Sequence, residues 1–182
     1  NIKLPAAVLT DDVVLQIISN GGVETPLRRG NYLERDFGNV LVMIQTSPNG
    51  CVRIMDGDAP ELSPYDQQRL FLVAPFSRLE NVETESDFKI PPAAVFGEEP
   101  AHGWCYYYQK ADLARQRKEW DKIPVLLKEA LDRGYYPEDR LEWMPFLQAY
   151  AVLGETKKVE SLAVQFQDDT FHKEQLCENL NR

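Results

Sequence analysis

The chain has 182 residues, of which 43% are hydrophobic and 27% are charged. These values are ordinary for a folded globular protein and exclude a disordered chain, and the length allows one large domain or two small ones. The net charge of −9 argues against nucleic acid as a partner, because phosphate binding needs clustered lysine and arginine. The sequence shows no apolar run of membrane-spanning length and no signal-peptide pattern. We therefore expect a soluble fragment, and the start at Asn1 without Met suggests a domain of a longer protein, with a processed protein as the alternative.

The first half of the chain is predicted to mix helix and strand. Thr10 precedes two acidic residues, which is typical of a helix start and predicts a helix from Asp11 to Ser19, although its β-branched residues favour a strand. The apolar run Gly38 to Thr46 and the run Cys51 to Met55 flank turn residues, which predicts a β-hairpin, with parallel pairing as the alternative. A further helix is expected to begin at Ser63, which a proline follows.

The second half is predicted to consist of amphipathic helices. The first helix carries an apolar stripe at helical spacing, made of Trp104, Tyr107, Tyr108, Ala111 and Ala114. The next helix is expected to begin after Asp121, with Pro124 in its first turn, and to end before Gly134. A third begins near Asp139, in a capping box with Glu142, and Pro145 should kink it or divide a short first turn from its body. A fourth helix follows and carries the apolar residues Val159, Leu162, Ala163 and Phe166.

The predicted fold class is therefore α+β, in two domains. Residues 1–97 form a small α/β domain that contains a β-hairpin or a short sheet, and residues 98–182 form a helical domain. The boundary lies near Gly97, in a loop rich in proline and glycine.

The helical half contains an internal repeat. Residues 117–120 align with residues 153–156 at an offset of about 36, close to the period of helix–turn–helix repeats. Ala111, Trp120 and Ala130 stand where the tetratricopeptide pattern has a small, an aromatic and a second small residue. The helical half therefore resembles a degenerate tetratricopeptide array, with a plain helical bundle as the alternative. The resemblance implies a groove for a ligand or partner lined by Tyr108, Asp112, Arg115, Gln116 and Gln148.

The three cysteines allow at most one intramolecular bridge. Outside the cytoplasm, a bridge between Cys51 and Cys105 would join the two halves, whereas Cys177 lies near the C-terminus. In a reducing compartment, Cys51 and Cys105 would be small core residues instead.

Few residues suggest a catalytic or metal-binding role. A weak candidate for a zinc site joins the two histidines with a nearby cysteine each, in the set His102, Cys105, His172 and Cys177. Core packing explains these residues better, so we expect no metal and no cofactor. The pairs Asp56 and Asp58, or Glu83 and Glu85, are expected to belong to turns and not to an acid–base pair. The aromatic run that begins at Trp104 is expected to pack in the core instead of stacking on a sugar.

A further resemblance rests on the NVLV-type strand at residues 39–42, on the strand Cys51 to Asp56 and on the run from Trp104 to Gln116. With these segments the chain resembles the soluble C-terminal region of bacterial multi-spanning membrane proteins of the dolichyl-phosphate-mannose glycosyltransferase type. The resemblance implies that the catalytic acids lie in the membrane part, which is absent from this chain. It also implies that this chain lies on the extracytoplasmic side of the membrane.

We therefore expect a non-catalytic binding or assembly domain. The partner of this domain would be another protein, the membrane domain of the same protein, or a glycan. The domain would contact the membrane only through segments that are absent from this chain. The alternative is an autonomous enzyme that acts on sugars or esters through its acidic loops.

Overall fold

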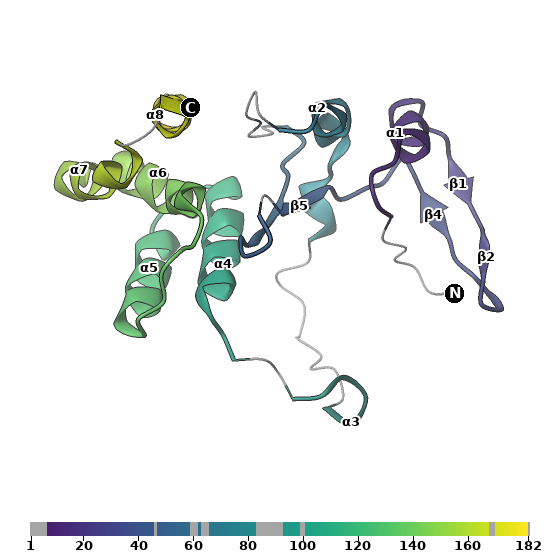
Figure 1. Ribbon diagram of the computed structural model, residues 1–182, viewed down its shortest axis with the longest axis horizontal. Helices are drawn as coiled ribbons and strands as arrows, with labels where there is room; N and C mark the ends of the chain where they lie inside the picture. The colour runs from purple at the N-terminus through teal and green to yellow at the C-terminus, as the bar shows by residue number, and fades with distance from the viewer. Residues whose placement is uncertain are drawn as a thin grey trace. The chain divides into compact units, whose positions relative to one another are not determined.

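The computed structural model describes residues 7–45, 47–58, 62, 66–82, 93–98, 101–167 and 170–181. Within these ranges the chain combines helices with short two-stranded sheets, so the predicted α+β class is confirmed (Figure 1). The chain divides into two compact units, Asn1–Ile44 with Ile54–Ser86 and Gln45–Arg53 with Asp87–Arg182. The division therefore differs from a single cut near Gly97, because residues 45–53 belong with the helices.

The first unit is built on two packed helices, α1 (Asp11–Ile18) and α2 (Gln68–Val73). The Thr10 hydroxyl caps α1 by accepting a hydrogen bond from the Val13 backbone nitrogen at 3.4 Å, so the strand alternative for this segment is wrong. Helix α2 begins later than predicted, and Ser63 and Pro64 lie outside the described residues. A 3-10 turn, η1 (Ala74–Phe76), continues α2. The core of this unit contains Val14, Ile17, Phe37, Val42, Met55, Leu70, Val73 and Ala74.

A β-ribbon that the sequence did not predict follows α1. Strand β1 (Val23–Glu24) pairs antiparallel with β4 (Arg35–Asp36), and β2 (Leu27–Arg28) pairs antiparallel with β3 (Asn31–Tyr32). Each strand has only two residues, which is too short for an alternating apolar pattern to be recognised. A short 3-10 turn, η2, later in the chain spans Leu79–Asn81.

The predicted β-hairpin is present but shorter than expected. Strand β5 (Met43–Gln45) pairs with β6 (Val52–Ile54). Before β5 the chain pairs elsewhere, because Val40 forms a parallel bridge with Ser77. The Ser77 hydroxyl accepts a hydrogen bond from the Val42 nitrogen at 2.9 Å and donates one to the Met55 carbonyl at 2.7 Å. Ser77 is buried, so this one side chain joins three segments of the first unit.

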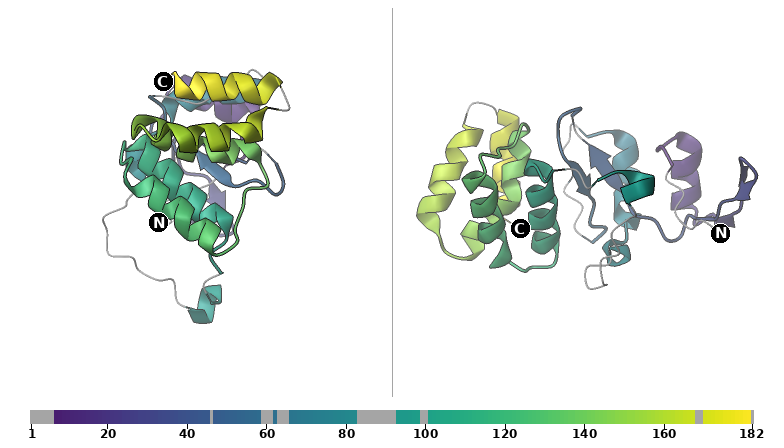
Figure 2. Two further views of the ribbon diagram at one scale, coloured as in Figure 1. Left: turned by 90° about the vertical axis from the view of Figure 1, so that its left-hand side faces the viewer. Right: turned by 90° about the horizontal axis from the view of Figure 1, so that it is seen from below.

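The second unit is helical (Figure 2). Helix α6 is at its centre and contacts α4, α5, α7 and α8, and α4 also packs against α5. No helix in the described part of the chain is long and apolar enough to cross a membrane. The elements are α3 (Ala93–Phe96), α4 (Trp104–Gln116), α5 (Lys122–Asp132), η3 (Arg140–Trp143), α6 (Met144–Val152), α7 (Thr156–Ala163), η4 (Val164–Phe166) and α8 (Thr170–Leu180).

Local signals predicted most of these helices. Gly134 adopts a left-handed conformation with φ of 77° just after α5, as expected of the residue that follows a helix. Pro145 lies in the first turn of α6, and the 3-10 turn η3 precedes it, so the chain is divided there as predicted. All five residues of the predicted stripe on α4 are buried. The core of the unit also contains Cys51, Ile123, Leu127, Ala130, Trp143, Met144, Phe146, Leu147, Ala149, Tyr150 and Phe166.

The two helical hairpins, α4–α5 and α6–α7, repeat the same geometry where their first helices end. Lys118 and Gly154, which are equivalent at the predicted offset, are both left-handed, with φ of 60° and 74°. The next backbone nitrogens close the same turn at the same length, from Glu119 to the Ala114 carbonyl and from Glu155 to the Tyr150 carbonyl, each at 2.8 Å. The backbone therefore has the same local conformation at these two turns, which are equivalent at the offset seen in the sequence.

Candidate functional site

Four of the five predicted groove residues form one hydrogen-bond network across α4 and α6. The Asp112 carboxylate accepts hydrogen bonds from Arg115 Nε at 3.0 Å, from Arg115 Nη2 at 2.7 Å and from Gln116 Nε2 at 2.9 Å. Arg115 Nη1 donates to Gln148 Oε1 at 3.3 Å. Asp112 and Gln148 are equivalent positions of the two repeats, so Arg115 links the first helix of one hairpin to the first helix of the next.

This network is largely internal. Asp112 and Gln148 are only 4% and 7% exposed. Arg115 and Gln116 are half-buried, and they form the edge of the network that solvent can reach. The spacing of three and four residues from Asp112 places all three α4 side chains on one helix face, which explains why they meet. Any partner would therefore contact Arg115 and Gln116 before it contacted the two buried members.

Tyr108, the fifth predicted groove residue, is buried one turn before Asp112. Burial raises the pKa of its phenol well above the usual value, and the Asp112 and Glu142 carboxylates raise it further, against the opposing effect of Arg53 and Arg115. Tyr108 is therefore a neutral side chain at physiological pH. It lies within electrostatic range of two carboxylates that belong to different parts of the helical unit.

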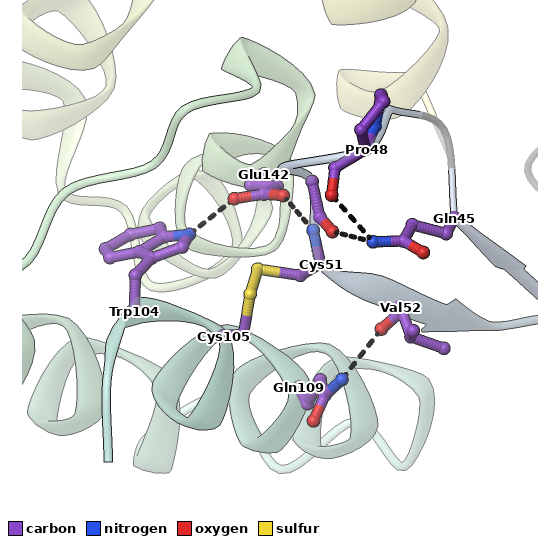
Figure 3. Close-up of a disulfide and its surroundings, with 9 residues drawn as sticks. Gln45, Pro48, Cys51, Val52, Trp104, Cys105, Gln109 and Glu142 are labelled. Carbon is purple, nitrogen blue, oxygen red and sulfur yellow. Dashed lines mark hydrogen bonds between the residues drawn. A yellow bond between two sulfur atoms is a disulfide. The ribbon is translucent and has the colours of Figure 1, made fainter. Parts of the chain in front are cut away.

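The second polar cluster surrounds a disulfide between Cys51 and Cys105, whose Cα atoms are 5.2 Å apart (Figure 3). This is the pair that the sequence analysis proposed for an oxidising compartment. Beside it, the carboxylate of Glu142 accepts hydrogen bonds from the Cys51 backbone nitrogen and from Trp104 Nε1, both at 2.6 Å. Gln109 Nε2 also donates to the Val52 carbonyl, at 3.1 Å. The segment 45–53 is thus held to the helices by the disulfide of Cys51 and by the hydrogen bonds of the Cys51 nitrogen and the Val52 carbonyl.

Glu142 is a residue whose role the sequence did not reveal. The sequence predicts a capping box of Asp139 and Glu142. The Asp139 carboxylate does cap the turn, by accepting a hydrogen bond from the Leu141 backbone nitrogen at 2.9 Å. Glu142 is buried instead, with only 4% of its surface exposed. Burial raises the pKa of its carboxyl, while the two donors, Cys51 and Trp104, act in the opposite direction. Its partners are 91 and 38 residues away in sequence, so no local pattern could have indicated them.

The weak zinc candidate does not fit the structure. The sulfur of Cys105 is bonded to Cys51 and is not available as a thiolate ligand. His102 stacks on Tyr106, with ring centroids 3.7 Å apart. Cys177 is exposed as a free thiol, and the side chain of His172 is outside the described part. Within the described ranges, no group of three or more metal-ligating side chains occurs.

The remaining candidates have local roles. The Asp56 carboxylate accepts a hydrogen bond from the Asp58 backbone nitrogen at 3.0 Å, which is turn geometry. Glu83 and Glu85 lie outside the described residues. Tyr106 stacks on His102 and lies under the Lys110 ammonium, 4.4 Å from its ring centroid. Both kinds of contact involve the ring, so Tyr106 is already engaged within α4 and the residues before it.

The chain matches no family model, no curated protein and no solved structure.

Proposed function

We propose that this chain is a non-catalytic binding or assembly domain whose partner contacts the first helices of its two hairpins. The observation that carries the proposal is the network in which Arg115 joins Asp112 to Gln148. Equivalent residues of successive repeats form the contact surface in helical repeat proteins, which bind along the side where first helices adjoin. The network supports this proposal because it joins the first helices of the two hairpins, and Arg115 and Gln116 are its partly exposed members.

The two buried carboxyl groups of the helical unit, Asp112 and Glu142, support a structural rather than a catalytic use. A general acid or base needs a carboxyl that can exchange its proton with a substrate. Asp112 is bonded to Arg115 and Gln116, and Glu142 is bonded to Cys51 and Trp104. Both groups are therefore engaged in holding the unit together.

We further propose that the domain lies on the extracytoplasmic side of a bacterial membrane, as part of a glycosyltransferase-like membrane protein that carries the catalytic acids elsewhere. The support for the compartment is the Cys51–Cys105 disulfide, since such bonds persist in oxidising compartments and are rare in the cytosol. The support for the larger protein is the resemblance carried by the run from Trp104 to Gln116. The partner in this proposal is the membrane part of the same protein.

The experiment is co-purification of this chain with the remainder of its full-length protein, the two expressed as separate chains. The full coding sequence should first show membrane-spanning segments before Asn1. The double variant Arg115→Ala and Gln116→Ala should then lose co-purification, while Lys128→Ala, an exposed change on the second helix α5, should retain it. Circular dichroism checks that both variants fold. Equal recovery of the folded double variant and the wild type would refute the site, and a coding sequence without membrane segments would refute the larger assignment.

A further inference from the structure

The end of the β-ribbon in the first unit exposes two large apolar side chains. Leu27 on β2 and Tyr32 on β3 are paired across the ribbon, and they are 58% and 64% exposed. Residues directly opposite each other in an antiparallel pair point to the same face, so the two side chains lie together on one face of the ribbon. Residues 27–32, which we call the ribbon tip, form the free end of the ribbon (Figure 1). The ribbon tip therefore presents apolar surface to solvent.

An arginine occupies the turn of the ribbon tip. Arg29 and Gly30 connect β2 to β3, and both have positive φ, of 49° and 81°. A two-residue hairpin turn of this kind favours asparagine or glycine at its first position, because left-handed backbone is unfavourable for other side chains. The exposed Arg29 side chain is thus held at the end of the ribbon at a cost in stability, and backbone of this kind is frequent at functional sites.

The ribbon tip is also a local exception to the charge of the chain. Residues 25–33 contain two arginines and no acidic residue, although the whole chain carries a net charge of −9. At physiological ionic strength, exposed charges more than about 8 Å apart are largely screened from each other, so the residues at a contact decide the charge that it favours. The ribbon tip therefore complements an anionic surface.

The size of the ribbon tip favours a membrane over a protein as that surface. A stable protein interface uses about 20–30 residues on each side, and the ribbon tip is far smaller. At a membrane, each apolar or basic side chain adds its own contribution. Tyrosine and arginine place their polar groups among the lipid headgroups and their carbon atoms against the acyl chains. The combination of Leu27, Arg29 and Tyr32 therefore suits the interface of an anionic bilayer.

We propose that the ribbon tip docks on an anionic phospholipid bilayer, with Leu27 and Tyr32 at the boundary of headgroups and acyl chains and Arg29 at the phosphates. The sequence predicts contact with a membrane only through segments absent from this chain, whereas this contact comes from within the chain. It shares no residue with the network around Asp112, so it stands or falls independently of the proposed partner site.

The test is co-sedimentation of the whole chain with vesicles of phosphatidylcholine alone and of phosphatidylcholine mixed with phosphatidylglycerol. The wild type should bind the mixed vesicles more tightly, and about 0.5 M salt should weaken this binding. Arg29→Asn removes the charge and introduces a residue that the turn favours, so it should fold and should bind about fivefold more weakly, the effect of one charge near the surface. Leu27→Ser should bind about tenfold more weakly, because its apolar side chain is lost.

Each variant has a matched control in the helical unit. Arg133→Asn changes an exposed arginine and Val125→Ser changes an exposed aliphatic residue on α5, and both should bind vesicles as the wild type does. Circular dichroism checks that all variants fold. The double variant Arg115→Ala and Gln116→Ala should also bind vesicles normally, which separates this proposal from the proposed partner site.

A second measurement needs no variant. Bicelles that carry phosphatidylglycerol and a spin-labelled lipid should broaden the amide resonances of Leu27 and Tyr32 and leave that of Ile123, in the helical core, unchanged. Absence of binding to the mixed vesicles, equal binding to both kinds of vesicle, or equal losses in the control variants would each overturn the proposal. If the wild type bound no lipid and Leu27→Ser lost co-purification with the remainder of the full-length protein, the partner of the ribbon tip would be a protein instead.

Discussion

The backbone nitrogen of Cys51 donates a hydrogen bond of 2.6 Å to the carboxylate of Glu142, a residue 91 positions later in the chain. The same carboxylate accepts the indole nitrogen of Trp104 at the same distance. Two donors from different segments therefore converge on one buried carboxyl group, next to the disulfide that joins Cys51 to Cys105. Each of its two oxygens accepts one of these hydrogen bonds, so Glu142 should be a key residue for the position of segment 45–53.

Replacing Glu142 by Gln should destabilise the protein, most strongly at acid pH. Glu142 Oε1 accepts the Cys51 nitrogen and Oε2 accepts Trp104 Nε1, so glutamine places an NH₂ group against one of the two donors, and a buried donor left unpaired costs about 1–3 kcal/mol. Because burial raises the pKa of Glu142 in the folded state, its contribution to stability is complete below the ordinary value of 4.5 and is lost as pH rises through the folded pKa. The difference in free energy of unfolding between the wild type and Glu142→Gln should therefore become smaller towards neutral pH. Urea unfolding across this window measures it.

Glu129→Gln is the control for this pH series, since Glu129 is an exposed carboxylate on α5 of the same unit and is not among the groups that shift the pKa of Glu142. Its free energy of unfolding should follow that of the wild type at every pH. A Glu142→Gln deficit that grew with pH would contradict the raised pKa.

Removing the disulfide should lower the free energy of unfolding by about 4 kcal/mol in the chain-entropy model, since the two cysteines are 54 residues apart. The measurement compares oxidised wild type with the double variant Cys51→Ser and Cys105→Ser. Cys177→Ser, at the exposed free cysteine, should have no effect. Thiol titration of oxidatively refolded, denatured and unreduced protein should find one free thiol, and a count of three would show that the bridge does not form.

Replacing Asp112 by Ala should be among the most damaging changes in the helical unit. It removes three hydrogen bonds and leaves the Arg115 guanidinium, whose side chain is only 11% exposed, without its carboxylate partner. Removing one member of a buried ion pair costs about 3–5 kcal/mol. Asp132→Ala is the matched control, because it breaks an exposed pair with Lys128 on α5 and should cost at most about 1 kcal/mol. Similar losses in the two variants, measured by urea unfolding, would argue against a buried network.

Replacing Ser77 by Ala should destabilise the first unit by about 1–3 kcal/mol. The change deprives the Val42 nitrogen of its acceptor and the Met55 carbonyl of its donor, both in a buried environment. Ser161→Ala, on the exposed face of α7, should stay within about 0.5 kcal/mol of the wild type. Hydrogen exchange of the Val42 amide should quicken in Ser77→Ala alone, and unchanged exchange would exclude the hydroxyl as its partner.

The helices of the second unit were predictable because the signals that begin and end them are local. Gly134 after α5 and Pro145 in the first turn of α6 act through their own backbone conformations, which tertiary packing did not override. The network around Asp112 is predictable in part for the same reason, since Arg115 and Gln116 are spaced to reach it on one helix. Its link to Gln148 required the repeat, which supplied the equivalent position on α6.

The features that the sequence did not predict depend on contacts between residues distant in sequence. Nothing near Glu142 indicates that its carboxylate is buried against Cys51 and Trp104, and the nearby Asp139 favoured a capping role instead. The two-residue strands of the first unit are too short to show a period. The late start of the strand predicted from Gly38 likewise follows from Ser77, which pairs with Val40 from 37 positions away.

The assignment of Gln45–Arg53 to the helical unit means that this unit is not contiguous in sequence. A fragment that begins near Gly97 would contain every helix from α4 onward but would lack the covalent partner of Cys105 and one of the two donors to Glu142. Such a truncated chain could be completed only by supplying the missing nine-residue segment as a separate peptide. During synthesis, that segment leaves the ribosome well before the helices that receive it, so the helical unit matures by capturing a piece of chain already made.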